Sequence, residues 1–371
     1  MKFLHTADIH LDSAFSSSGA TGAEARRGHQ RQCLQRIFAL ARQEQCDFIL
    51  MAGDIFDTSF VTPETEELCL SLFEDFKKPI IISAGNHDPY VEGSFYKKEL
   101  PKNVYIFTSS ELQYFDFPEL SLTVGGYSFT SAALSASPLE SQPPRQRTQQ
   151  HLILCAHADL DAPTSRYAPV MSSDIKRLGF DYAALGHVHN TPAAQDNVRY
   201  CGFPEGRSFD ERGDGGVLLV TLSDENSLTA ERRILSNRRY VWEELSLDGI
   251  GDTEEMEKLI TDTLLSIDAQ KESFVRLTLT GTIPPSSLPD SKIFEEKKPP
   301  HISELEIIDS TLAIPDGAFL EKDTTLRGEF YRSLRSGLCS DDPSERARTL
   351  YALRIGLAAI DGKSFTEGGK L

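Results

Sequence analysis

The chain has 371 residues and a formal net charge of −18 at pH 7, with 39% hydrophobic and 25% charged residues. This length predicts two domains, and the composition is that of a globular protein, which excludes a wholly disordered chain. An acidic chain is a poor non-specific binder of nucleic acid, because affinity for phosphates comes largely from Lys and Arg. Any phosphate chemistry must therefore take its positive charge from a source other than the bulk composition.

Membrane insertion and secretion are both disfavoured by the sequence. No apolar run approaches the roughly 18 residues that a membrane span needs. The first ten residues meet polar side chains too early for the apolar core of a secretory signal. The six cysteines include no C-x-x-C pair, so we expect buried thiols in a reducing compartment. These features predict a cytoplasmic protein without membrane contact.

The first 238 residues alternate short apolar runs with helical patterns. A helix is expected after Thr62, a good N-cap, because Pro63 suits the first position of a helix. Strands that alternate with helices predict α/β layers, and long apolar runs predict strands that are covered on both faces. The expected strands span 3–7, 47–52, 79–84, 151–156, 182–185 and 216–222, and the expected helices span 32–45 and 63–76.

The pattern changes near residue 239, which we take as a domain boundary. A β-α-β-β order follows and predicts a small α+β domain over 239–320, and two helical stretches predict a C-terminal helical region with a frayed tail over 321–371. Two segments rich in Pro with Ser, Gln, Arg or Lys predict loops. The strands are expected at 240–247, 274–280 and 304–308, the helices at 253–267, 324–336 and 344–359, and the loops at 131–150 and 284–300.

Five short polar patterns each follow or end a predicted strand. In an α/β fold the loops beyond the carboxyl ends of the strands line one crevice, so these patterns are expected to converge. Because alternate residues of an extended chain point the same way, we expect two pairs to send both side chains into one pocket: Asp8 with His10, and His187 with His189. The patterns are Asp8-Ile9-His10, Gly53-Asp54-Ile55-Phe56-Asp57, Gly85-Asn86-His87-Asp88, Ala156-His157-Ala158-Asp159 and Gly186-His187-Val188-His189.

The residue types in these patterns indicate metal ions. Carboxylate oxygen, amide oxygen and imidazole nitrogen, with no thiolate, suit Mn, Fe or Zn and disfavour a structural zinc site. Seven candidate ligands are too many for one ion and suit two ions that share a bridging carboxylate. Two divalent ions about 3.5–4 Å apart activate water and clamp the oxygens of a phosphoryl displacement. The candidates are Asp8, His10, Asp54, Asn86, His157, His187 and His189. Such ions would attract phosphate whatever the overall acidity of the chain.

The five patterns together resemble the calcineurin-like metallophosphoesterase superfamily. The resemblance covers residues 1 to about 240, and the stretches Phe3–Ser13 and Gly202–Glu211 are similar to SbcD-type DNA repair exonucleases, most of all to their YhaO-like branch. The resemblance implies an α/β fold of the four-layer type, with two β-sheets flanked by helices, a small α+β capping domain and C-terminal helices.

The resemblance also implies individual roles. Asp8, His10 and His189 would hold one ion, while Asn86, His157 and His187 would hold the other, with Asp54 as the bridge. His87 would lie near the leaving group as general acid, and Asp57 would pair with it and favour its protonated form. Some relatives have His in place of Asp57, and a simple turn or cap residue is the alternative for it. Asp88 would be a hydrogen-bond partner of a metal ligand.

The activity that the resemblance implies is hydrolysis of a DNA phosphodiester with two divalent ions, manganese foremost, with iron, zinc or magnesium as alternatives. SbcD-type enzymes act as 3′→5′ exonucleases on duplex ends and as endonucleases on single strands, and they work with an SMC-like ABC ATPase that binds helices after the capping domain. A homodimer through helices of the nuclease domain is implied in the same way. Arg26, Arg27 and Arg207 are candidate phosphate contacts, with solvated surface arginines as the alternative.

Two other functions fit the same residues. A phosphomonoesterase or cyclic-nucleotide phosphodiesterase would share the metal core, because the surrounding loops set the substrate. A scaffold subunit of an ATPase–nuclease complex would keep the fold with little activity alone. The complete ligand set disfavours this scaffold, since a degenerate site normally loses ligands.

Overall fold

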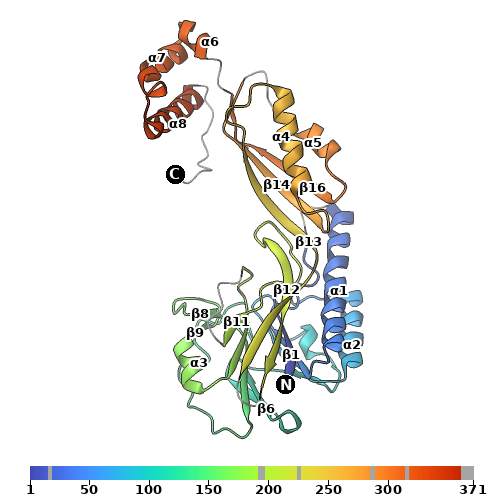
Figure 1. The fold of residues 1–371 in the computed structure, drawn as a ribbon. Coiled ribbons are helices and arrows are strands. Elements are labelled where there is room, and N and C mark those ends of the chain that lie inside the picture. The colour runs from blue at the N-terminus through green and yellow to red at the C-terminus, as the bar shows by residue number, and fades with distance from the viewer. Residues whose placement is uncertain (16–18, 191–196, 224–226, 285–288, 314–316, 361–371) are drawn as a thin grey trace. The chain divides into compact units, whose positions relative to one another are not determined.

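The computed structural model describes residues 1–371 except 16–18, 191–196, 224–226, 285–288, 314–316 and 361–371. The chain divides into two compact units, Met1–Arg239 (unit 1) and Tyr240–Leu371 (unit 2) (Figure 1). Among the described residues, none of the helices is both long enough and apolar enough to span a bilayer.

The first sheet of unit 1 carries three of the predicted polar patterns. Strands β1 to β4 are parallel neighbours, and β12 pairs antiparallel with β1. The order is β12 (Gly213–Leu222), β1 (Lys2–Thr6), β2 (Phe48–Ala52), β3 (Ile80–Ser83) and β4 (Val104–Ile106). Helices α1 (Gly19–Gln43) and α2 (Pro63–Phe76) lie beside this sheet (Figure 1). The Thr62 side chain caps α2 by accepting the backbone N–H of Thr65, as predicted.

The second sheet of unit 1 carries the other two patterns. Its strands are parallel except for the antiparallel pair β5–β6. The order is β11 (Val198–Tyr200), β10 (Tyr182–Gly186), β7 (His151–His157), β6 (Leu122–Gly126) and β5 (Gln113–Phe117). Helix α3 (Ser172–Leu178) lies on the side of unit 1 opposite α1 and α2 (Figure 1). A short separate ladder joins β8 (Asp159–Leu160) to β9 (Pro169–Val170).

Three apolar clusters show how the layers of unit 1 pack. One joins α1 and α2 to the first sheet and includes Leu34, Phe38 and Phe73. A second fills the space between the two sheets, where alternate residues of facing strands meet. A third joins the far face of the second sheet to Ile175 and Leu178 of α3. The result is the predicted four-layer arrangement of two sheets flanked by helices.

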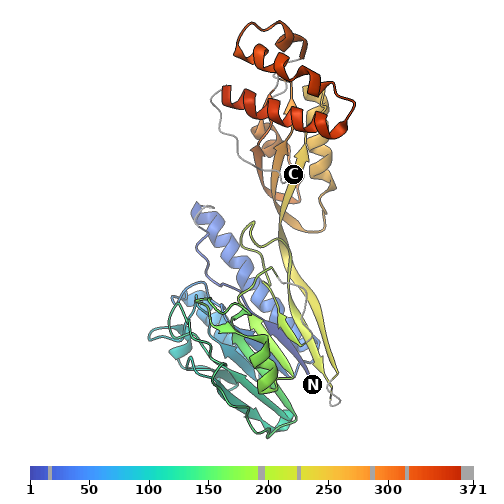
Figure 2. The ribbon, with the colours of Figure 1, turned by 90° about the vertical axis from the view of Figure 1, so that its left-hand side faces the viewer.

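Unit 2 contains a three-stranded sheet portion with helices on one face and a separate helical group. Strand β13 (Leu228–Ser246) borders β12 and β14, and it crosses the boundary between the units. Helices α4 (Thr253–Ser266) and α5 (Ser291–Lys297) pack on β14 (Glu272–Thr280) and β16 (Ile302–Asp309) through an apolar cluster. A short β15 (Thr282–Ile283) pairs with β17 (Leu312–Ala313). The helices α6 (Gly317–Lys322), α7 (Leu326–Leu338) and α8 (Pro343–Ile360) share their own cluster, and Figure 2 shows α7 and α8 side by side.

The structure differs from the predicted elements in a few places, each with a physical reason. Helix α1 begins near Gly19 and not at residue 32. The sequence pattern missed its first turns because they are polar and lack an apolar period. Strand β13 begins at Leu228 and not at residue 240. The sequence pattern missed its first half because that half is polar and pairs with a neighbouring strand instead of burying an apolar face. Within the predicted loop 284–300, a capped short helix forms over Ser291–Lys297, with Asp290 accepting the N–H of Lys292. Five cysteines are buried as expected, whereas Cys339 is exposed.

Candidate metal centre

All five predicted patterns lie at strand ends of unit 1, across both sheets. Asp8 and His10 follow β1, Asp54 and Asp57 follow β2, and Asn86 and His87 follow β3. His157 is the last residue of β7, and His187 and His189 follow β10. Because the parallel strands of each sheet end at the same edge, the fold brings together patterns that are distant in the sequence.

Asp8, His10 and Asp54 reach the site through left-handed turns and not through strand alternation. Strand β1 ends at Thr6, and the backbones of Asp8, His10 and Asp54 have positive φ angles of 53°, 49° and 50°. Non-glycine residues adopt such angles at a cost of about 1–3 kcal/mol, which the surrounding structure must offset. The loops after β1 and β2 bond to each other: His10 N donates to Asp54 O at 3.0 Å. Strain at these positions points to function.

Two glycines make room for the ligands. Gly53 has a φ of +90°, and a Cβ there would come within 2.5 Å of His157 Nδ1. A Cβ on Gly85 would come within 2.1 Å of Asp54 Oδ1. Both positions therefore require glycine for the close approach of backbone to a ligand side chain.

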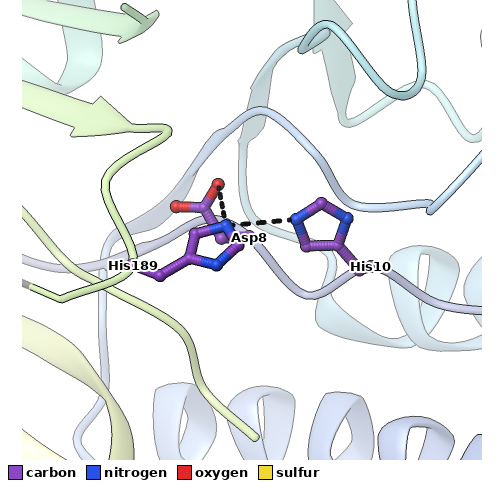
Figure 3. Close-up of side chains that lie close together, drawn as sticks. All are labelled: Asp8, His10 and His189. Atoms are coloured by element: carbon purple, nitrogen blue, oxygen red, sulfur yellow. Dashed lines mark hydrogen bonds and ion pairs between the residues drawn. The ribbon is translucent and has the colours of Figure 1, made fainter. Parts of the chain in front are cut away.

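The first ligand group contains Asp8, His10 and His189, whose ligand atoms all lie within 4.8 Å of one another. His10 Nε2 lies 3.3 Å from His189 Nε2, and His189 Nε2 lies 3.6 Å from Asp8 Oδ1. Figure 3 shows the two rings with these nitrogens directed toward each other, beside the Asp8 carboxylate. Asp8 and His10 are almost fully buried.

The second ligand group lies around His157. Its Nε2 is 3.3 Å from Asp54 Oδ2 and 3.1 Å from Asn86 Oδ1. The same Asp54 Oδ2 is 3.6 Å from His10 Nε2, so it faces both groups. The other oxygen, Asp54 Oδ1, accepts the backbone N–H of His87 at 3.0 Å. Asp54 Oδ2 thus lies between the two groups, where the predicted bridging carboxylate would have to lie.

The donor chemistry of both groups fits divalent cations. His10 Nδ1 donates to Asp57, His189 Nδ1 to Glu211, and His157 Nδ1 to the Ala52 carbonyl. In the neutral rings each Nε2 then carries a lone pair, and these lone pairs face one another or the oxygens of Asp54 and Asn86. Acceptors that converge in this way repel one another unless a proton or a metal cation lies between them.

The shifts in the pKa values of His189 and Asp54 also indicate that positive charge is favoured at this position. Burial alone would lower the pKa of His189, but the carboxylates of Asp8 and Glu211 raise it to about 10. Burial opposes ionisation of Asp54, yet the charge of His157 and its hydrogen bond hold the pKa of Asp54 well below its usual range. A metal ion that binds here would replace a proton that the carboxylates attract.

His187 lies beside the second group without joining the groups formed by the described His, Asp and Glu residues. Its ring centroid is 5.1 Å from that of His157, and its backbone N–H donates to both oxygens of Asp8 at 3.1 and 3.0 Å. Its Nε2 is 3.3 Å from Asp159 Oδ1, which leaves Nδ1 as the ligand atom in the neutral ring. The predicted ligand role of His187 therefore stays a prediction.

His87 and Asp57 lie at the exposed side of the centre. His87 Nδ1 donates to the backbone carbonyl of Asp57 at 3.1 Å, and its side chain is 45% exposed. The Asp57 carboxylate is 3.9 Å from His87 Nδ1 but 3.1 Å from His10 Nδ1. Asp57 thus holds a metal ligand more closely than it holds the predicted general acid. Burial would raise the pKa of Asp57, but His10 and the Arg207 guanidinium hold it below its usual range.

Two acidic residues with no predicted role hold ligand rings. Glu211 contacts His189 Nδ1 at 2.7 Å, and Asp159 contacts His187. Glu211 lies in the stretch 202–211, and Asp159 lies two residues after His157. The sequence signal for both residues is therefore that they lie in or next to a recognised motif. Asp88, expected to be a hydrogen-bond partner of a metal ligand, accepts the backbone N–H of the candidate ligand Asp54, and it also accepts those of Ile55 and Gly85, so it fixes the loops themselves.

The predicted phosphate contacts have different surroundings. Arg207 lies at the centre and pairs with Asp57 at 3.0 Å and with Glu211 at 2.7 Å. Arg27 pairs with Glu24, and the guanidinium of Arg26 lies 5.6 Å from the centroid of the Phe15 ring. The structure thus places only Arg207 beside the metal ligands.

Residues 1–191 match the family described as calcineurin-like phosphoesterase. The chain is 28% identical over 306 residues to the uncharacterized metallophosphoesterase YhaO of Bacillus subtilis, across 76% of this chain and 72% of that protein. It is 25% identical to the SbcD subunit of the nuclease SbcCD of Bacillus subtilis (68% of this chain, 74% of that protein) and 26% identical to that of Staphylococcus epidermidis (62% and 68%). The family match covers all five patterns and the strands that carry them. The chain belongs to the calcineurin-like phosphoesterase family, whose members are metal-dependent phosphoesterases that bind two divalent ions.

Proposed function

We propose that this protein is a DNA phosphodiester hydrolase, acting as a 3′→5′ exonuclease on duplex ends and as an endonuclease on single strands. The observation that carries the proposal is the convergence of the two ligand groups on Asp54 Oδ2, beside an exposed histidine, in a chain similar to nuclease subunits over about two thirds of its length. A two-ion centre of this kind supports hydrolysis of a phosphoester, and the likeness to the nuclease subunits favours DNA as the substrate.

Each part of the site has a role in this proposal. Asp8, His10 and His189 would hold one ion, Asn86, His157 and His187 the other, and Asp54 both. When bound, the two ions supply positive charge for the phosphate and an activated water. The chain itself fixes the ligand rings through the hydrogen bonds at their second nitrogens, and this holds the donor atoms in place before substrate arrives.

His87 supplies the proton for the leaving oxygen. Its Nδ1–H is committed to the Asp57 carbonyl, so Nε2 is the atom that carries the transferable proton. The Asp57 carboxylate lies 3.9 Å from His87 Nδ1. The exposed position of His87 lets it reach a substrate that is too large to enter a closed pocket.

Other parts of the proposal come from the resemblance to SbcD-type nucleases or from the sequence alone, and not from the geometry of the site. They are manganese as the preferred ion, an SMC-like ABC ATPase partner, a homodimer, a cytoplasmic location and phosphate contacts by Arg26 and Arg27. The ATPase would bind at α7 and α8. The apolar residues of these helices pack partly on each other, with Phe330 and Leu334 against Leu353 and Leu357, whereas Leu326 is exposed.

The test compares substrates on one preparation of manganese-loaded protein. We expect release of nucleotides from the 3′ ends of a labelled blunt duplex, and slower hydrolysis of a small aryl phosphodiester and an aryl phosphomonoester. The H87A variant, loaded with the same ions, controls for a contaminating nuclease. Hydrolysis of the small esters alone would assign the chain to the monoesterase or cyclic-nucleotide class. Loaded protein that is inert on every phosphoester, alone and with an ATPase partner, would identify a scaffold subunit.

A further inference from the structure

The side chain of Arg207 joins two carboxylates that serve different metal ligands. Its Nη1 donates to Asp57 Oδ1 at 3.0 Å, while Nε and Nη2 donate to Glu211 Oε1 at 2.9 and 2.7 Å. These same oxygens contact the ligand rings: Asp57 Oδ1 faces His10 Nδ1, and Glu211 Oε1 faces His189 Nδ1. The contacts therefore link His10 to His189 through Asp57, Arg207 and Glu211.

We propose that Arg207 is a positioning residue that fixes His10 and His189 around one of the two ions and leaves the other ion largely unaffected. We refer to Asp57, Arg207 and Glu211 as the arginine clip. The inference rests on the metal centre of the proposed function and not on which phosphoester is cleaved.

The local sequence favours the clip over a phosphate contact. Arg207 and Glu211 are four residues apart in one turn, and the Arg207 backbone N–H donates to Glu211 Oε2 at 2.7 Å. Asn190, next to His189, donates to the Asp210 carbonyl at 2.9 Å and ties this turn to the ligand segment. Glu211 is only 3% exposed in its side chain, so its charge needs a buried partner.

The geometry requires arginine. A guanidinium offers donors in a fixed fork that reaches two carboxylates at once, whereas a lysine ammonium is a single point charge. Without Arg207, Asp57 and Glu211 would be two carboxylates that repel each other across the centre, and each would be less able to hold its ring. The second ligand group lacks this dependence, because His157 is held by the Ala52 backbone carbonyl, which no side-chain substitution removes.

The experiment counts and titrates manganese ions in metal-free protein that is reloaded. Calorimetry gives the affinities, elemental analysis gives the stoichiometry, and manganese EPR reports whether two ions are magnetically coupled. We expect two ions in the wild type. In R207A we expect one ion with wild-type affinity, the other weakened by about ten- to a hundred-fold, and loss of the coupled signal at limiting manganese.

Matched variants separate positioning from general damage. R207K should behave as R207A, because lysine cannot hold both carboxylates. E211Q, which keeps an acceptor for His189 Nδ1 but loses the charge, should weaken the same ion to a smaller degree. R145A removes an exposed ion pair with Asp116 elsewhere in unit 1 and should leave both ions unchanged. Thermal unfolding of each metal-free variant monitors folding.

Three results would overturn the inference: wild-type affinities for both ions in R207A, equal weakening of both ions, or full rescue by R207K. Wild-type protein that binds fewer than two ions would contradict the metal centre itself, and the clip with it. A protein that binds two ions and shows the selective loss, yet cleaves no DNA, would leave the clip standing and reject the proposed substrate.

Discussion

The two halves of the metal centre are held in place by different means. Around His10 and His189, charged side chains set the rings, and these side chains come from the loop after β2 and from the turn before β12. Around His157, a backbone carbonyl of β2 sets the ring, and Asn86 follows directly from β3. The rings of His10 and His189 thus depend on a few side chains that substitution can remove, whereas the ring of His157 depends on the backbone of the sheet. We therefore expect substitutions to perturb the two ions of the centre separately.

The largest effect is expected where the two halves share an atom. Asp54 Oδ2 faces both groups, so D54A should weaken both ions by more than about 100-fold and abolish detectable turnover. Metal analysis after gel filtration measures the loss. D54N, which keeps the shape, should retain more metal than D54A. A variant that kept one tight ion would show that Asp54 belongs to one half only.

His87 should affect turnover without affecting either half. We expect H87A to bind two ions but to lower kcat by about 10²–10⁴ on DNA, because no group then protonates the leaving oxygen. An aryl phosphodiester with an acidic phenol as its leaving group needs no such proton, and the loss on it should be much smaller. Equal losses on both substrates, or loss of metal, would contradict the general-acid role.

Asp159 is expected to affect the half of the centre around His157. It holds His187, so D159N is expected to weaken the ion on the His157 side by about tenfold. The double variant R207A/D159N distinguishes the halves. If the two substitutions act on different ions, the double variant weakens both, as manganese titration would show. A double variant that keeps one ion at wild-type affinity would place His187 in the same half as His10 and His189.

The smallest effect on ion binding is expected at His5, a buried residue of β1. This buried ring donates Nε2–H to the Leu185 carbonyl of β10 and accepts from Tyr182 Oη, and burial lowers its pKa to about 4. The unfolded chain binds a proton near pH 6.5 and the folded chain does not, so stability from this residue is present above pH 6.5 and is lost as the pH falls toward 4. The loss is on the order of 3 kcal/mol.

Denaturant unfolding at several pH values tests this expectation. The free energy of unfolding should fall less steeply between pH 6.5 and pH 4 in H5Q than in the wild type, while both ions bind H5Q normally. Parallel pH dependences for the two proteins would rule out the neutral buried form of His5.

Much of the centre was predictable because strand ends are visible in sequence. Strands β1, β2 and β3 are apolar runs that end shortly before a polar residue. These runs predicted the positions of Asp8, Asp54 and Asn86 at the edge of the sheet. The α2 boundaries followed from Thr62 and Pro63 because capping is local chemistry. The sequence did not reveal how the ligands reach the site, since the left-handed turns at Asp8 and His10 depend on the neighbouring loop for their hydrogen bonds.

The residues that hold the ligands were less visible. Glu211 and Asp159 act across tertiary contacts, and no spacing rule connects Glu211 with His189. Arg207 was a candidate phosphate contact because it lies in the stretch 202–211, which resembles SbcD-type nucleases. Its pairing with two carboxylates arises only when the turn before β12 approaches the loop after β2. Contacts between side chains from separate loops are the part of a site that sequence patterns describe least.

The most direct test of the two-ion centre is anomalous diffraction from crystals grown with manganese. We expect two peaks that flank Asp54, one between His10 and His189 and the other beside His157 and Asn86. A single peak, or peaks that lie away from Asp54, would contradict the two-ion centre.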